Sequence, residues 1–189
     1  MWSATKISAD AANKMQTNAG ILLNTFDIKS PTEPADSAII CETTGDFSIT
    51  CVPETADFFE DVNNAPTNTK EGKRITGWTC GLSITALSIT EEMIKLSLGA
   101  SEVGVDGGVH PRTQYKAEDF KSLYWIGDMI DESKLFVIAM DNTVSTGGLS
   151  FTATDDGKGN LGLELTPHAT IEDMDKVPMA FYILTKVGQ

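Results

Sequence analysis

The chain of 189 residues is long enough to enclose one hydrophobic core, and its 41% hydrophobic and 22% charged residues are ordinary for a globular domain. Its 14 lysine and arginine residues against 27 aspartate and glutamate residues give a formal net charge of −13, which argues against a basic surface for nucleic acid. The longest apolar run, residues 135–140, is far shorter than the roughly 20 residues of a transmembrane helix.

The first residues of the chain are polar and do not lead into the sustained apolar segment of a secretory signal, so we expect the protein to stay in the compartment where it is made. Three cysteines, Cys41, Cys51 and Cys80, form no C-x-x-C pair. This usage favours a reduced, cytosolic origin over a disulfide-stabilised scaffold.

The amino-terminal half predicts strands separated by one long loop. Residues 1–19 read as a flexible leader, and residues 20–28 form an apolar and β-branched first strand. Strict alternation over residues 45–52 predicts a half-buried second strand. Residues 54–76 then hold several asparagines with Pro66 and Gly72, which predicts a long loop of the kind that is functional or disordered.

Alternation returns over residues 78–85 and predicts another strand, with Trp78 on its apolar face. A short helix is expected over residues 91–98. Thr90 is its N-cap, two glutamates fill its first turn, and Gly99 ends it.

The carboxyl-terminal half predicts strand after strand. Residues 104–112 carry three glycines and read as a turn. The predicted strands cover residues 123–126, 135–140, 149–154, 161–166 and 177–186. The sum is about eight short strands and one helix without β-α-β alternation, so the expected fold is a single, mainly β domain: an antiparallel β-sandwich or barrel with one flanking α-helix.

The sequence contains no complete motif for catalysis, cofactor binding or metal binding. The string Gly157, Gly159, Gly162 fits G-x-G-x-x-G, but a strand pattern follows it, so it lacks the helix N-terminus that binds phosphate. His110 and His168 each lack a second ligand at metal-binding spacing. We therefore expect no enzyme, no cofactor and no metal site.

One acidic segment carries two large apolar side chains. Phe58 and Phe59 lie among aspartates and glutamates, where they need cover from this subunit or from a neighbour. Lys70, Lys73 and Arg74 form a basic cluster in the same predicted loop. These five residues are the candidate self-assembly site. That the loop reaches an adjacent subunit and meets its acidic surface is implied by the family resemblance that follows.

Three segments together resemble the major tail tube protein of long-tailed, siphovirus-like bacteriophages and prophages of Gram-positive bacteria. The first runs from Gly45 through the Phe58-Phe59-Glu60-Asp61 segment to Gly77-Trp78. The second is the run Leu123-Tyr124-Trp125-Ile126-Gly127-Asp128, and the third extends from Ser145 through Gly157-Lys158-Gly159 to Val177-Pro178.

The resemblance implies a tail tube fold whose copies form stacked, hexameric rings and a hollow tube for DNA. Implied partners are further copies of the chain and the tail tape-measure, tail terminator and distal tail proteins, with DNA as transient cargo and no membrane. The implied location is the virion tail, assembled in the host cytoplasm. An acidic wall suits such a conduit because it repels the phosphate backbone.

Two other readings stay open at this point. A tube protein of a contractile or secretion-type injection particle would share the architecture, and a neighbouring sheath gene would identify it. A β-sandwich binding module is disfavoured by the missing signal peptide.

Overall fold

The computed structural model describes residues 11, 13–44, 47–64, 66–153 and 159–187. Its strands are β1 (Gln16–Leu23), β2 (Ile39–Thr43), β3 (Ser48–Asp57), β4 (Lys73–Ala86), β5 (Ser101–Val103), β6 (Val109–Pro111), β7 (Lys121–Met129), β8 (Lys134–Ser145), β9 (Ser150–Ala153), β10 (Gly159–Thr166) and β11 (Met179–Thr185). The α-helix α2 spans Glu91–Leu98, and single 3-10 turns cover Asp36–Ala38, Ala117–Asp119 and Ile171–Asp173. The fold is mainly antiparallel β with a flanking helix, as predicted.

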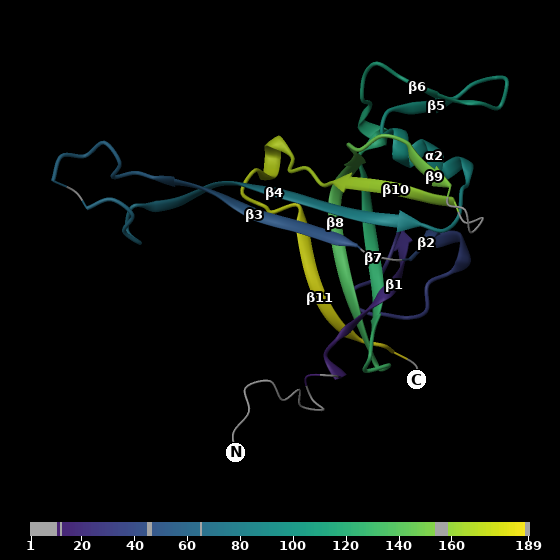
Figure 1. Ribbon diagram of the computed structural model, residues 1–189, viewed down its shortest axis with the longest axis horizontal. Helices are drawn as coiled ribbons and strands as arrows, with labels where there is room; N and C mark the ends of the chain where they lie inside the picture. The colour runs from purple at the N-terminus through teal and green to yellow at the C-terminus, as the bar shows by residue number, and fades with distance from the viewer. Residues whose placement is uncertain (1–10, 12, 45–46, 65, 154–158, 188–189) are drawn as a thin grey trace.

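Six of these strands close into a barrel (Figure 1). The order β7-β1-β2-β4-β10 is joined into a ring by β8, which pairs with β7 along most of its length and with β10 at Val144 and Ser145. The link between β2 and β4 is the shortest, with Thr43 opposite Ala86. Closure removes free strand edges from the barrel itself.

The barrel interior is one apolar cluster to which every barrel strand contributes. Alternate residues of each strand point inward, as expected for a half-buried strand. The fully buried members include Leu22, Leu82, Ile84, Leu123, Trp125, Ile138, Met140, Leu161, Leu163 and Leu165. A second, smaller cluster, built on Leu23, Ile126 and Val137, lies on the outer side, where Phe26 and Ala38 of the β1–β2 connection cover it.

Strand β8 serves both clusters, which explains its uninterrupted apolar sequence. Ile138 and Met140 belong to the barrel interior, whereas Val137 belongs to the outer cluster. The prediction that residues 135–140 are buried on both faces is confirmed at these positions.

The helix matches its prediction at both ends. The Thr90 side chain accepts a hydrogen bond from the Met93 amide (3.2 Å), and Gly99 ends the helix with a positive φ of 71°. Met93 and Leu96 place their side chains in the barrel core. The helix is thus fixed to the barrel by its apolar side.

Three strands flank the barrel: β11 pairs with β8, β9 with β10, and β3 with β4. The inner half of β3 still contacts the core, because Ile49 and Cys51 pack against it, as does Phe47 just before the strand. A separate ribbon of β5 and β6 stands beside the helix. This ribbon encloses residues 104–108, so only the first part of the predicted turn 104–112 is a turn, because residues 109–111 belong to β6.

Several elements differ from the sequence predictions. Strand β1 begins at Gln16, inside the segment 1–19 that was expected to be a flexible leader, and residues 1–10 and 12 of that segment lie outside the described residues. Strand β2 had no predicted counterpart. The predicted loop 54–76 is wrong at both ends, because residues 54–57 belong to β3 and residues 73–76 to β4.

Candidate functional site

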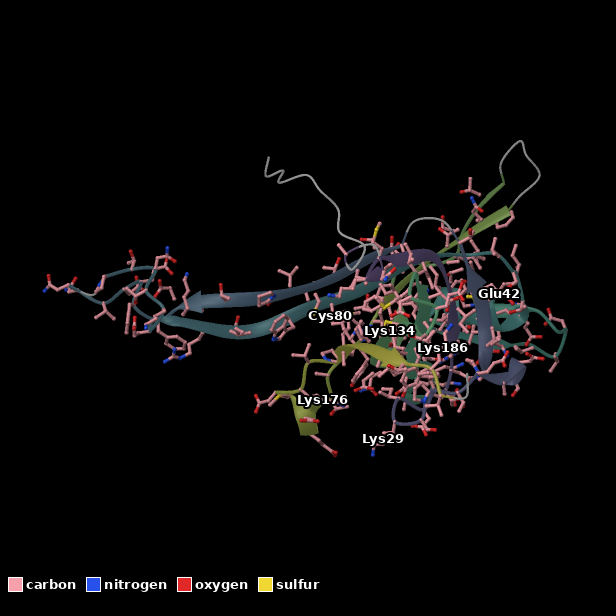
Figure 2. The ribbon with its side chains drawn as sticks, turned by 90° about the horizontal axis from the view of Figure 1, so that it is seen from below. Lys29, Glu42, Cys80, Lys134, Lys176 and Lys186 are labelled. Carbon is pink, nitrogen blue, oxygen red and sulfur yellow. The ribbon has the colours of Figure 1, made fainter. Side chains whose placement is uncertain are left out.

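Strands β3 and β4 continue well beyond the barrel as a two-stranded ribbon (Figures 1 and 2). They pair from Ser48 opposite Ser83 to Asp57 opposite Lys73, whereas β10 pairs with β4 only at residues 82–86. Residues 52–79, comprising the outer strands and their connection, are called the arm below. In the described part of the chain no third strand pairs with the arm.

The length of β4 requires such a projection. Fourteen residues at about 3.3 Å each extend about 46 Å, more than the core of a small barrel can cover. Burial along the strand changes accordingly. Cys80, Leu82, Ile84 and Ala86 are buried, whereas residues 73–76, 78 and 79 are exposed.

A bulge determines which side chains share one face of the arm. Glu54 lies opposite Gly77 and Thr55 lies opposite Ile75, so Thr76 has no partner residue on β3. Opposite residues of an antiparallel pair lie on the same face. The extra residue therefore keeps Ile75 on the face of Trp78.

This face carries Pro53, Ile75 and Trp78, with Thr55 opposite Ile75, and is called the apolar face of the arm. The exposed fraction is 58% for Ile75 and 39% for Trp78. The opposite face carries Val52, Ala56 and Arg74 in the same register. Exposed apolar side chains gathered on one surface are typical of protein interfaces.

The arm lacks the support that a ribbon in water needs. An isolated two-stranded ribbon is marginally stable at best, and its outer backbone groups offer hydrogen bonds to another chain. Within the described residues, the arm's internal contacts are local, such as the hydrogen bond from the Thr79 hydroxyl to Glu54 Oε1 (2.7 Å). An additional surface, supplied by another molecule, would stabilise it.

The tip of the arm comprises residues 57–64 and 66–74. The carboxylate of Asp57 holds two of its backbone segments together by hydrogen bonds. One of its carboxylate oxygens accepts a hydrogen bond from the Phe59 amide (3.0 Å), and the other accepts one from the Asn68 amide (2.6 Å). These two backbone donors, followed by the charge of Lys73, lower the pKa of Asp57 below its ordinary value. The Phe58 amide also donates to the Gly72 carbonyl (3.0 Å), which closes the loop.

The five residues predicted as a self-assembly site all lie at this tip. Phe58 is 66% exposed and lies under the Arg74 guanidinium, whose carbon is 5.9 Å from the ring centre. Phe59 is half-buried and occupies the space beside Gly72, where an added Cβ would come within 2.9 Å of its ring. From the sequence, both phenylalanines are expected to need cover. The tip covers Phe59 within the chain and leaves Phe58 largely exposed.

The basic cluster is a weaker attractive surface than its sequence suggests. Lys73 Nζ lies 3.9 Å from the Asp57 carboxylate, and Lys70 Nζ lies 3.6 Å from that of Glu71. Arg74 also donates to the backbone carbonyl oxygens of Glu71 and Lys73, at 3.0 Å each. All three cations therefore have partners within the arm.

Sequence reasoning missed Ile75 and misplaced Trp78. Trp78 shares its alternation with Cys80 and Leu82, so the pattern assigned it to the core; the structure leaves it substantially exposed. The length of the alternating segment is the one signal in the sequence that points to an exposed Trp78. Its apolar positions extend beyond the part of the strand that the barrel core buries. The bulge that brings Ile75 to the same face leaves no mark in the hydrophobic pattern.

Other kinds of site have little support in the described residues. Among them, no group of three or more His, Cys, Asp or Glu side chains could hold a metal ion. Nor do these residues contain a helix of the length and apolar character that a membrane span requires.

No protein-family model matches the chain, and no curated protein matches it. Among solved structures, a chain of the "Virion of native gene transfer agent (GTA) particle" is similar with a TM-score of 0.41 and 9% sequence identity, over 86% of this chain and 95% of that one. A likeness this distant establishes neither a family nor a function.

Proposed function

We propose that the chain is a non-enzymatic structural subunit of a bacteriophage tail that assembles through its arm. In this proposal, copies form stacked, hexameric rings, and the rings form a hollow tube through which DNA passes. The arm of one subunit packs its apolar face, Pro53, Ile75 and Trp78, on a neighbouring subunit. The uncovered arm is the single observation that carries the proposal.

The energetics favour this use of the arm. Burying a large apolar side chain contributes about 1.5–3 kcal/mol. Covering Ile75 and Trp78, together with new hydrogen bonds at the ribbon edges, would offset the entropy of holding the arm in one position. A closed barrel also suits a stacked subunit, because it confines open strand edges to the flanking strands.

The proposal of stacked rings that form a tube, and not some other assembly, rests on the resemblance of three sequence segments to tail tube proteins. The first of these segments, residues 45–78, includes nearly all of the arm. The net charge of −13 fits a channel wall that does not bind the DNA sliding past it.

Negative-stain electron microscopy of the concentrated protein tests the tube directly. We expect hollow tubes of uniform width. A chain that stays monomeric at all accessible concentrations would contradict the proposed assembly.

A paired substitution tests the role of the arm. We expect Ile75→Thr with Trp78→Thr to abolish tubes while leaving the fold intact by circular dichroism, because both positions are exposed in the single subunit. The matched control is Val105→Thr, which also removes an exposed apolar side chain, outside the arm, and should still form tubes. Normal tubes from the paired variant would show that Ile75 and Trp78 are not needed for assembly. That result would contradict the role of the arm but not the formation of a tube.

A further inference from the structure

Two cysteines face each other at the root of the arm. Cys51 of β3 and Cys80 of β4 are direct partners in the strand register, and their sulfur atoms lie 3.4 Å apart as free thiols. The pair lies where the ribbon leaves the barrel; Figure 2 labels Cys80 at this junction. The two cysteines are 29 positions apart along the chain.

The backbone geometry suits a covalent bond between them. Opposite residues of an antiparallel pair have Cα atoms about 4.5 or 5.5 Å apart, depending on the hydrogen-bonding pattern. Both values lie within the span of about 4.4–6.8 Å that a disulfide bridges. Rotation of the two side chains therefore suffices to bring the sulfur atoms to bonding distance.

The two thiols differ in their access to solvent. Cys80 is 6% exposed and belongs to the barrel core, whereas Cys51 is half-buried at the edge of that core. Burial, followed by the hydrogen bond with the Cys51 sulfur, raises the pKa of Cys80 to about 12. Cys51 is thus the thiol that a dissolved reagent meets first.

The third cysteine is an internal control. Cys41 is 1% exposed in the barrel core, and burial raises its pKa to about 12 as well. It has neither solvent access nor the cross-strand sulfur neighbour that the other two share.

We propose that Cys51 and Cys80 are a redox-active dithiol, which a small-molecule disulfide of the oxidised glutathione class converts into a cross-strand disulfide. The Cys51 thiol loses its proton to solvent, and its thiolate attacks one sulfur of the small disulfide, forming a mixed disulfide and releasing one thiolate, which takes up a proton from solvent. The Cys80 sulfur then attacks the Cys51 sulfur, and its proton passes to the second departing thiolate. The protein loses two hydrogen atoms, and the small disulfide is reduced to two thiols.

The bond would join the outermost pair of opposite residues on β3 and β4 that still contacts the barrel core. Val52 and the residues beyond it have no such support. A disulfide at this rung fixes the register of the ribbon and joins its two strands covalently before they enter solvent. This inference concerns the single subunit and does not depend on what the arm binds.

Mass spectrometry of the dilute, folded protein treated with oxidised glutathione tests the proposal. We expect the chain to lose the mass of two hydrogen atoms and its reactive thiols to fall from three to one under denaturing conditions. Peptide mapping should join the Cys51 peptide to the Cys80 peptide and leave Cys41 free. Dithiothreitol should restore all three thiols.

Two variants separate the steps. Cys80→Ala should stop at a stable mixed disulfide on Cys51, and Cys51→Ala should stay unmodified while native, because its two remaining thiols are buried. Circular dichroism checks that both variants fold, and the wild-type peptide map needs neither of them. A wild-type chain without the linkage, a linkage that includes Cys41, or rapid modification of folded Cys51→Ala would each overturn the proposal.

Discussion

Thr43 connects three barrel strands through one buried hydroxyl group. The Thr43 hydroxyl accepts a hydrogen bond from Trp125 Nε1 (3.1 Å) and donates one to the Gly20 carbonyl oxygen (2.9 Å). The Trp125 ring fills the space beside Gly20, where an added Cβ would lie 2.4 Å from the ring. The threonine thus satisfies the one polar atom of the largest side chain in the core.

Thr43→Val keeps the shape of the side chain and removes its hydrogen bonds. Because the Trp125 N–H would remain buried without a partner, we expect the free energy of unfolding to fall by about 1–3 kcal/mol. Urea denaturation followed by tryptophan fluorescence measures this difference. Thr185→Val, at an exposed position on β11, is the matched control and should change stability by less than about 0.5 kcal/mol. Equal losses in both variants would contradict the role of the buried hydroxyl.

At the scale of elements, the tip of the arm depends on an ionised carboxylate. Asp57 accepts its two backbone hydrogen bonds as the charged form, and these bonds lower its pKa below the ordinary value of 3.8. A lowered pKa in the folded tip means that these bonds are fully present above pH 3.8. They are lost as the pH falls through the lower, folded-state pKa.

An NMR titration of the Phe59 and Asn68 amide protons measures this dependence. We expect both shifts to change together with a midpoint below 3.8, because both amides contact the same carboxylate. Asp57→Asn should abolish the shared titration while leaving the barrel resonances in place. A midpoint at or above the ordinary aspartate value would show that the tip does not hold the carboxylate in this way.

The elements that the sequence predicts well are those with local signals. Thr90 and Gly99 mark both ends of the helix, and the alternation of residues 161–166 marks β10. Strand β2 was missed because its five residues are too few to show a period, and its burial comes from partners far along the chain. Residues 54–76 of the arm read as a loop in the sequence because their middle holds Asn63, Asn64, Pro66, Asn68 and Gly72, while the strand residues on either side lack a buried face.

The candidate site was found in part for the same reason. Phe58, Phe59 and the three cations were recognised by composition, and they do lie together. Ile75 and Trp78 depend on strand register, a bulge and the limited extent of the core, none of which is local in sequence. Their role in assembly stays a prediction, as does that of the tip.

At the scale of the whole molecule, the acidity of the chain opposes self-association. Each copy carries a formal charge of −13, and the cations of the arm tip are already paired within it. General repulsion should therefore outweigh attraction between the tip and a neighbouring acidic surface.

Salt should accordingly promote assembly. Raising the concentration from about 0.1 M to about 1 M shortens the Debye length from about 10 Å to about 3 Å. We expect the lowest protein concentration that gives tubes, measured by light scattering, to fall. The Ile75→Thr, Trp78→Thr variant has the same charge and should not associate at either salt concentration. Dissociation of wild-type tubes in high salt would show that ion pairs between subunits dominate.

The closed barrel also constrains how the chain acquires its structure during synthesis. Strand β1 lies between β2 and β7, and Gly20 pairs with Gly127, so more than half of the chain separates these neighbours. The β3–β4 and β7–β8 hairpins pair segments that are close along the chain, so we expect them to form before the barrel closes, which requires β10, ending at Thr166. Such distant pairing slows folding, and a nascent chain leaving the ribosome exposes the β7-facing edge of β1 until β7 has emerged.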